Sequence, residues 1–120
     1  MITMVSIFKA SKVKAIQRKG YSASYIADIV FKQKIDSSGF ILVEVAEGTK
    51  SSPHKHEELE EVFVCLSDIT MIIDSVDYDL QTGDVVLVSP GESHSFENRT
   101  GSPVTLLAIK FPNLKNDKAS

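Results

Sequence analysis

The chemistry available to this sequence centres on its histidines. Only three occur in 120 residues, and two of them, His54 and His56, stand two positions apart in the stretch HKHEELEEVFVC. The third, His94, opens the stretch HSFEN. Neutral imidazole is the commonest metal ligand in proteins, so three imidazoles brought together would bind a divalent cation. The alternative is three separate surface or core histidines, and a His-x-His pair alone does not decide between the two.

A carboxylate follows the histidine pair. Side chains alternate faces along a strand, so His54 and His56 point the same way if their stretch is extended. Glu61 opens the next predicted strand and shares a face with Phe63 and Cys65. Three imidazoles and one carboxylate on inward faces predict a metal site. Imidazole suits Zn, Cu, Fe and Ni, and the carboxylate keeps Mn among the candidates.

Other acidic residues crowd the same loop. Glu57, Glu58 and Glu60 are expected to be solvated, because a carboxylate must project inward to bind a metal. Glu60 is the main competitor of Glu61, and it shares its face with Val62. Only one of the two faces can look into the protein.

Short strands must position these side chains. Segments rich in β-branched and aromatic residues alternate with turn signals, and the predicted strands are 24–34, 40–46, 61–66, 69–74, 76–80, 85–88, 94–98 and 104–111. Only residues 6–17 are expected to contain a helical turn or two. Strands at this spacing favour an all-β sandwich or barrel. The stretch VVLV, apolar on both faces, requires cover on both sides.

Composition limits the function further. The chain is 42% hydrophobic and 24% charged, with a net charge of −3, which is typical of one globular domain. The basic run of residues 9–19 lacks interleaved aromatic residues, so nucleic-acid binding is not expected. A single cysteine excludes an internal disulfide. With no membrane span or signal peptide recognisable, we expect a cytoplasmic protein without a membrane partner.

Two stretches together resemble the two motifs of the cupin superfamily. The residues that match the family's spacing are Gly48, His54, His56 and Glu61 in the first stretch and Gly83, Gly91, His94 and Asn98 in the second. The resemblance covers about residues 40–111. It implies a jelly-roll barrel, also called a double-stranded β-helix, and a metal held by three histidines and Glu61. It also implies that the glycines shape turns and that Asn98 stabilises one.

Two positions depart from the family's pattern. Asp68 stands where the first motif ends in glycine, and a positive φ is expected there, which Asp tolerates better than most residues. Ser89 stands where the second motif has proline, and Pro90 follows it. Neither change touches a ligand, so the resemblance still implies a metal site.

The resemblance implies one cupin domain over residues 1–120. Its barrel core is expected at about 40–111, with N-terminal strands in residues 1–39 and a flexible tail over residues 112–120. We predict a homodimer, because residues 85–88 and 104–111 have apolar outer faces and segment 24–33 could lie across a partner.

Further residues are candidates for the surroundings of the metal. Phe63 and Phe96 flank two ligands and are expected to wall the pocket. Cys65 is either a reactive thiol or, as favoured, a small core residue. The remaining candidates are Phe40, Leu42 and Met71, for which core packing is favoured, Glu44, equally an exposed edge residue or a polar cavity group, and Tyr25 and Lys32, of which at most one can face the cavity.

The resemblance implies a small cupin that acts with a divalent metal (Fe, Mn, Zn, Ni or Cu) on a small molecule, by dioxygenase, isomerase or lyase chemistry. The alternative is a non-catalytic binding or sensor module for a ligand such as a sugar or carboxylate. A metal that only stabilises the barrel is a third interpretation. No general acid or base beyond the metal ligands stands out, although strand parity leaves Tyr25, Glu44 and Cys65 as candidates.

Overall fold

The computed structural model describes residues 5–32 and 34–117, which form ten strands and one 3-10 turn. The elements are β1 (Ser6–Phe8), η1 (Ala10–Lys12), β2 (Ile16–Arg18), β3 (Tyr21–Ala23), β4 (Gly39–Val45), β5 (Glu60–Cys65), β6 (Ile69–Ile73), β7 (Val76–Leu80), β8 (Val85–Val88), β9 (His94–Glu97) and β10 (Val104–Phe111). The strands predicted from residue 40 onward are present with ends that differ by at most one residue. The all-β prediction is therefore confirmed.

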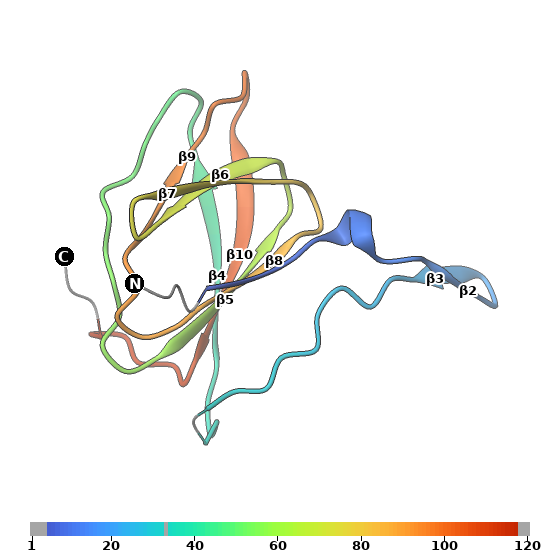
Figure 1. Ribbon diagram of the computed structural model, residues 1–120, viewed down its shortest axis with the longest axis horizontal. Coiled ribbons are helices and arrows are strands. Elements are labelled where there is room, and N and C mark those ends of the chain that lie inside the picture. Colours follow the sequence, from blue (N-terminus) through green and yellow to red (C-terminus); the bar gives the residue numbers. More distant parts are fainter. Residues whose placement is uncertain (1–4, 33, 118–120) are drawn as a thin grey trace.

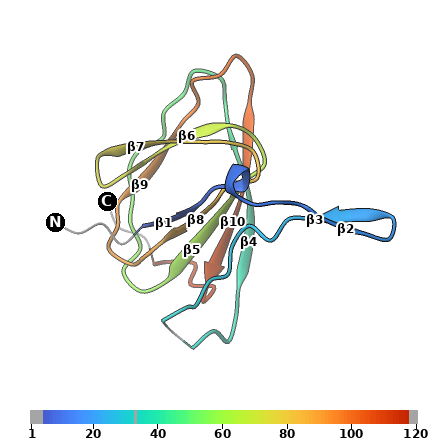
Figure 2. The same cartoon turned by 45° about the vertical axis from the view of Figure 1, so that its right-hand side comes forward.

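Two antiparallel sheets face each other across the core. One has the strand order β1-β8-β5-β10-β4 and the other β7-β6-β9 (Figures 1 and 2). Their inner faces contribute large, fully buried side chains such as Phe63 and Leu106 from the first sheet and Met71 and Ile73 from the second. Alternation along each strand sends every second residue into this core, so strand register decides which side chains can meet inside.

The register of β5 settles which of its faces points inward. Lys110 of β10 pairs with Glu61, and Ala108 pairs with Phe63. Phe63 and Cys65 belong to the buried core, which confirms the predicted inward face of this strand. Glu60 consequently points to the other side of the sheet.

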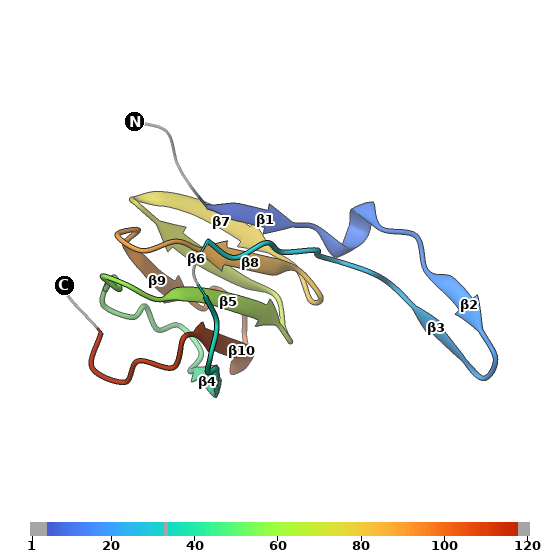
Figure 3. The same cartoon turned by 90° about the horizontal axis from the view of Figure 1, so that it is seen from below.

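The N-terminal region differs from the prediction. Segment 24–34 was expected to form a strand, but no strand occurs between Ala23 and Gly39 among the described residues. The helical expectation for residues 6–17 reduces to the single turn η1. Strands β2 and β3 pair only with each other, in a hairpin that extends away from the barrel (Figures 1 and 3).

Segment 24–32 contacts the outside of the barrel instead of joining a sheet. The ring centroid of Phe31 lies 4.5 Å from that of Phe111, and the amide of Lys32 donates to the Glu60 carboxylate at 3.0 Å. Apolar and β-branched residues suit a strand, yet a strand needs a neighbour with free hydrogen-bonding groups. Here the segment is held to the barrel through Phe31 and Lys32, while Tyr25 and Val30 are exposed.

The predicted turn residues behave largely as expected. Gly48, Gly83 and Gly91 have positive φ, a conformation that glycine adopts without steric cost. Asp68 is a correction, because Asp74 and Ser75 are the non-glycine residues with positive φ in the described chain. The Asp68 carboxylate instead accepts a hydrogen bond from the Thr82 amide at 2.8 Å, which ties two turns together.

Asn98 stabilises the turn after β9, as the resemblance implied. Its side-chain nitrogen donates to the Val45 carbonyl at 3.0 Å and to the Ser102 carbonyl at 2.8 Å. Its side-chain oxygen accepts from the amide of Thr100 at 2.9 Å. The buried amide is thus fully hydrogen-bonded.

The C-terminal segment after β10 makes defined contacts up to Asp117. The amide of Asn113, for example, donates to the Ser37 hydroxyl at 3.1 Å. Residues 118–120, which the predicted flexible tail also includes, lie outside the described residues. In the described part of the chain, no helix is long and apolar enough to cross a bilayer.

Candidate metal centre

Backbone pairing brings His54 and His94 together. His54 lies in the loop before β5, and His94 is the first residue of β9. Their backbones form an antiparallel bridge, with N···O distances of 3.0 and 2.8 Å, and their ring centroids lie 4.3 Å apart. His56, two residues further on, places its ring centroid 5.4 Å from each of the other two. A sequence separation of about forty residues is therefore closed by one pair of backbone hydrogen bonds.

Glu61 reaches the same point from the opposite sheet. One of its carboxylate oxygens lies 3.0 Å from Nε2 of His56 and 3.3 Å from Nε2 of His94. One ligand atom from each of His54, His56, Glu61 and His94 lies within 4.8 Å of the others. We call these four residues the histidine cluster. Among the described residues it is the one such group of three or more potential ligands.

Contacts within the cluster shift the pKa values of Glu61 and His56 in opposite directions. Burial raises the pKa of Glu61, but the hydrogen bond from His56 and the close approach of the His94 imidazole, at 3.3 Å, outweigh it and lower that pKa to about 2. Burial lowers the pKa of His56, but its hydrogen bonds to Glu61 and to the Asp117 carbonyl leave the pKa above the ordinary value of 6.5. The carboxylate is therefore charged at neutral pH, and the cluster attracts positive charge.

His94 shows that the cluster is suited to a cation. Its side chain is buried, and neither ring nitrogen has a hydrogen-bond partner among the described residues. A buried polar atom left without a partner costs about 1–3 kcal/mol, so such atoms in folded proteins demand an explanation. A divalent metal bound between the histidines and Glu61 would satisfy a ring nitrogen of His94. The donor set fits such an ion.

Asp117 positions His56 from the far end of the chain. Nδ1 of His56 is hydrogen-bonded to the Asp117 backbone carbonyl, which leaves Nε2 facing the cluster. The Asp117 carboxylate accepts from the amides of Glu57, Glu58 and Leu59 at 2.8, 2.8 and 2.9 Å. Burial raises the pKa of the Asp117 carboxyl, but the hydrogen bonds from these three amides outweigh burial, so the pKa lies below its ordinary value. No local sequence pattern marks this residue, and the prediction of a flexible tail overlooked it.

The cluster opens into a small pocket of about 190 Å³. Apart from the cluster, the lining residues are Ile41, Val43, Phe63, Phe96, Ala108 and Lys110. The predicted walls Phe63 and Phe96 are thus confirmed. Lys110 is the only lysine or arginine that lines the pocket, and it makes no ion pair within 4.0 Å among the described residues.

The prediction for β4 was wrong by one residue. Phe40 and Leu42 were candidates for the barrel lining, but they are 66% and 70% exposed on the outer face. Their neighbours Ile41 and Val43 line the pocket instead. All these residues are apolar, so the alternation that normally reveals the inner face is missing. Met71, by contrast, is fully buried in the core, as favoured.

The other candidates lie away from the pocket. Glu57 and Glu58 are exposed as predicted, whereas Glu60 is buried, which corrects the expectation of a solvated side chain. The burial of Glu60 is tolerated because its carboxylate accepts a hydrogen bond from the Lys32 amide. The candidates Glu44, Tyr25 and Lys32 are exposed as well. Cys65 belongs to the buried core, as favoured, and burial, with Asp84 nearby, raises the pKa of its thiol to about 12.

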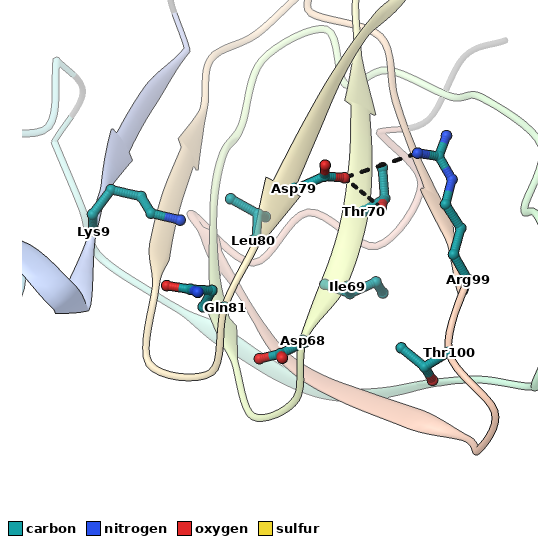
Figure 4. A pocket seen from close by; sticks show the side chains of 9 residues that line it. All are labelled: Lys9, Asp68, Ile69, Thr70, Asp79, Leu80, Gln81, Arg99 and Thr100. Atoms are coloured by element: carbon teal, nitrogen blue, oxygen red, sulfur yellow. Dashed lines mark hydrogen bonds and ion pairs between the residues drawn. The ribbon is translucent and has the colours of Figure 1, made fainter.

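A larger hollow of about 490 Å³ lies outside the barrel beside β6 and β7 (Figure 4). Both basic residues that line it, Lys9 and Arg99, are ion-paired. Arg99 pairs with Asp77 at 2.7 Å and with Glu97 at 2.9 Å, and Lys9 pairs with Asp84. Asp68, which also lines it, accepts hydrogen bonds from Thr82. This hollow does not include the histidine cluster.

A family model described as "Cupin domain" matches residues 41–110. The match runs from β4 to β10 and includes every residue of the histidine cluster. Together with the two packed antiparallel sheets, it confirms the jelly-roll barrel that the motifs implied.

Three relatives illustrate the similarity. An oxalate-binding protein of Thermotoga maritima is 27% identical over 95 residues, which are 77% of this chain and 78% of the relative. An uncharacterized protein of Methanocaldococcus jannaschii is 29% identical over 69 residues, which are 57% of this chain and 55% of the relative. The solved structure of a sugar phosphate isomerase from a cupin superfamily of Silicibacter pomeroyi is 28% identical, with a TM-score of 0.58, and the match covers 65% of this chain and 52% of that chain. The chain thus spans only about half of the last two proteins.

Proposed function

Because this chain belongs to the cupin superfamily, we propose that it binds a divalent metal through the histidine cluster and holds a small carboxylate at that metal. The observation that carries this proposal is the buried His94 ring, whose two nitrogens have no hydrogen-bond partner in the described protein. The three histidines and Glu61 would hold the ion. Bound there, the metal would supply a Lewis acid with positions free for a ligand.

The pocket supports a small anionic ligand. Its volume of about 190 Å³ is below the range of drug-sized sites. Lys110 lies on the neighbouring strand, opposite Glu61, and offers a cation that is not ion-paired with any of the described residues. The apolar walls keep water away and strengthen the attraction between opposite charges. A carboxylate could bind the metal with one end and approach Lys110 with the other, and the similarity to an oxalate-binding protein supports the same ligand class.

A catalytic role is the second candidate function. Its support is the similarity to the sugar phosphate isomerase and a ligand shell that suits Fe, Mn, Zn, Ni or Cu. Outside the cluster, Lys110 is the one titratable side chain that lines the pocket among the described residues. Acid–base chemistry would therefore depend on Lys110 or on the metal.

The decisive experiment is metal analysis followed by ligand titration. Protein purified without added metal or nickel affinity resin is expected to contain about one divalent ion per chain by elemental analysis. Calorimetry of the metal-loaded protein with oxalate and other small carboxylates should then show binding that disappears in the metal-free protein. Product analysis of the same mixtures tests turnover. Binding without product supports the binding module, and absence of any metal contradicts both functions.

Acid is expected to release the metal. Protons compete for the imidazole nitrogens, and because the pKa of His56 is raised, this competition begins above the ordinary value of 6.5. The charge on Glu61 persists to a pH of about 2, so protonation of histidine controls the loss. Metal content measured after equilibration from pH 8 to pH 4 checks this. Full occupancy at about pH 4 would contradict ligation by three histidines.

Lys110→Met is expected to weaken carboxylate binding about tenfold or more and to leave metal binding intact. Hydrogen bonds that involve a charged group contribute about 1.5–3 kcal/mol, and 1.4 kcal/mol corresponds to tenfold in Kd. Calorimetry with oxalate measures the change. Lys50→Met removes an exposed lysine outside the pocket and should bind oxalate as the unaltered protein does. Equal affinity of both variants would exclude Lys110 as the anion partner.

A further inference from the structure

A second hollow lies where the two sheets approach each other beside the metal centre. Among the described strands, β4 is the edge of its sheet and pairs with β10 alone. The chain turns at the end of β4 and returns beside β9 (Figure 1), where Lys50 and His54 form backbone bridges. Residues 43–45 of β4 and residues 49–52 of this returning segment line a hollow of about 420 Å³, together with His54 and Phe96. We call it the side hollow.

The side hollow adjoins the metal pocket. Val43, His54 and Phe96 line both of them. His54 belongs to the histidine cluster, so a molecule held at the metal lies next to the side hollow. The metal pocket alone, at about 190 Å³, is smaller than the usual small-molecule site of about 300–1,000 Å³. The two hollows together reach that range, so they can hold a ligand longer than the pocket alone admits.

The side hollow differs from the metal pocket in its chemistry. The pocket has apolar walls around the cluster, whereas the side hollow is lined by hydroxyl residues and by one charged residue of each sign. These residues are Glu44, Thr49, Lys50, Ser51 and Ser52. Neither Glu44 nor Lys50 is ion-paired with any of the described residues. Glu97, the bridge partner of Lys50, pairs with Arg99 at 2.9 Å, so both charges remain available to a ligand.

Two of the hydroxyls retain hydrogen-bonding capacity. Oγ1 of Thr49 donates to the Ala46 carbonyl at 2.7 Å, and its oxygen can still accept. Oγ of Ser51 accepts from the Phe96 amide at 2.8 Å, and its hydrogen can still be donated. The side hollow thus offers donors and acceptors together, which suits hydroxyl groups, because each of them donates one hydrogen bond and accepts two. An alkyl chain would use none of these groups.

We propose that the metal pocket and the side hollow form one site for a hydroxylated carboxylate, such as an open-chain sugar acid. This inference rests on the proposed function, because the carboxylate head lies at the metal and only the hydroxylated chain enters the side hollow. Lys50 and Ser51 donate to the hydroxyl oxygens of the chain, and Glu44 accepts from its hydroxyl hydrogens. The side hollow therefore selects the tail of the ligand, whereas the metal and Lys110 hold its head.

Calorimetry of the metal-loaded protein with matched 2-hydroxy acids tests the selection of the tail. Glycolate, gluconate and 2-hydroxyhexanoate share one metal-binding head, and their tail is absent, hydroxylated or apolar. Gluconate is expected to bind at least about tenfold more tightly than either of the others, which is the gain from one hydrogen bond to a charged group. Equal affinities for glycolate and gluconate, or tighter binding of 2-hydroxyhexanoate than of gluconate, would overturn the proposal.

Variants of the two charged residues locate the tail. Lys50→Met and Glu44→Met should each weaken gluconate binding about tenfold and leave metal content and the affinity for glycolate unchanged. Lys12→Met and Glu47→Met are the matched controls, since both residues are exposed and neither lines the side hollow. If the first pair of variants affects gluconate no more than the controls do, the tail lies elsewhere and the proposal is wrong.

Two further measurements separate the alternatives. A phosphate at the end of the chain would be attracted by Lys50 and repelled by Glu44, so 6-phosphogluconate should bind no more tightly than gluconate. A clearly tighter complex would show that the side hollow selects an anion, which contradicts the proposal. If neither oxalate nor glycolate binds the metal-loaded protein, the proposed function fails and this inference fails with it. If both bind and gluconate gains nothing, only this inference fails.

Discussion

Glu61→Gln is expected to lose its metal, whereas Glu60→Gln is expected to keep it. Glu61 is the one carboxylate of the histidine cluster, within 3.0–3.3 Å of two imidazole nitrogens. An amide in its place provides a neutral, weaker ligand and cannot balance the charge of the ion. Loss of a hydrogen bond behind a metal ligand already costs about 10–100-fold in affinity. Loss of the ligand itself should cost more.

The Glu60 variant is a stringent control. Glu60 is next to Glu61 in sequence and is buried like it. Its carboxylate, however, lies on the other side of the sheet and accepts a hydrogen bond from the Lys32 amide. Glutamine retains an oxygen that accepts the same hydrogen bond, so the fold should persist. Metal content by elemental analysis, followed by competition with a chelator, compares the two variants. Loss of metal from the Glu60 variant and retention by the Glu61 variant would mean that the register of β5 is wrong by one residue.

The histidine cluster could be predicted from sequence because its geometry depends on local rules. Alternation along a strand aligns His54 with His56 and Glu61 with Phe63, and two spaced motifs then relate these pairs to His94. The same rule failed at β4, where residues 40–43 are apolar without interruption. Both faces of that strand are apolar: Ile41 and Val43 line the pocket, and Phe40 and Leu42 are exposed on the other face. Periodicity cannot reveal the inner face of such a strand.

The errors elsewhere have a different physical cause. Segment 24–34 has the composition of a strand, but strand formation depends on a free sheet edge, which composition does not describe. Glu60 was expected in solvent because buried carboxylates are rare; its partner is a backbone amide twenty-eight residues away. Asp117 likewise acts on a loop about sixty residues distant. Such contacts depend on the path of the chain in three dimensions.

Asp117→Ala is expected to weaken metal binding about 10–100-fold, the usual effect of losing a group that orients a metal-binding histidine. The carboxylate accepts hydrogen bonds from three loop amides, and the Asp117 carbonyl accepts a hydrogen bond from Nδ1–H of His56. Without the carboxylate, the carbonyl is no longer fixed, and His56 can rotate or change tautomer. Chelator competition measures the affinity. Hydrogen exchange at the amides of Glu57, Glu58 and Leu59 should accelerate in the same variant.

Two truncations separate this role from a general effect of the C-terminus. A chain that stops after Lys118 keeps Asp117 and its carbonyl in a peptide bond, so it should bind metal as the full chain does. A chain that stops after Asn116 lacks both groups and should show at least the loss of the alanine variant. Asp117→Asn retains one acceptor oxygen and should be intermediate. A purely structural contact would lower the free energy of unfolding while leaving the affinity of the folded, metal-loaded protein unchanged. Equal affinities of the two truncated chains would therefore show that His56 is oriented without Asp117.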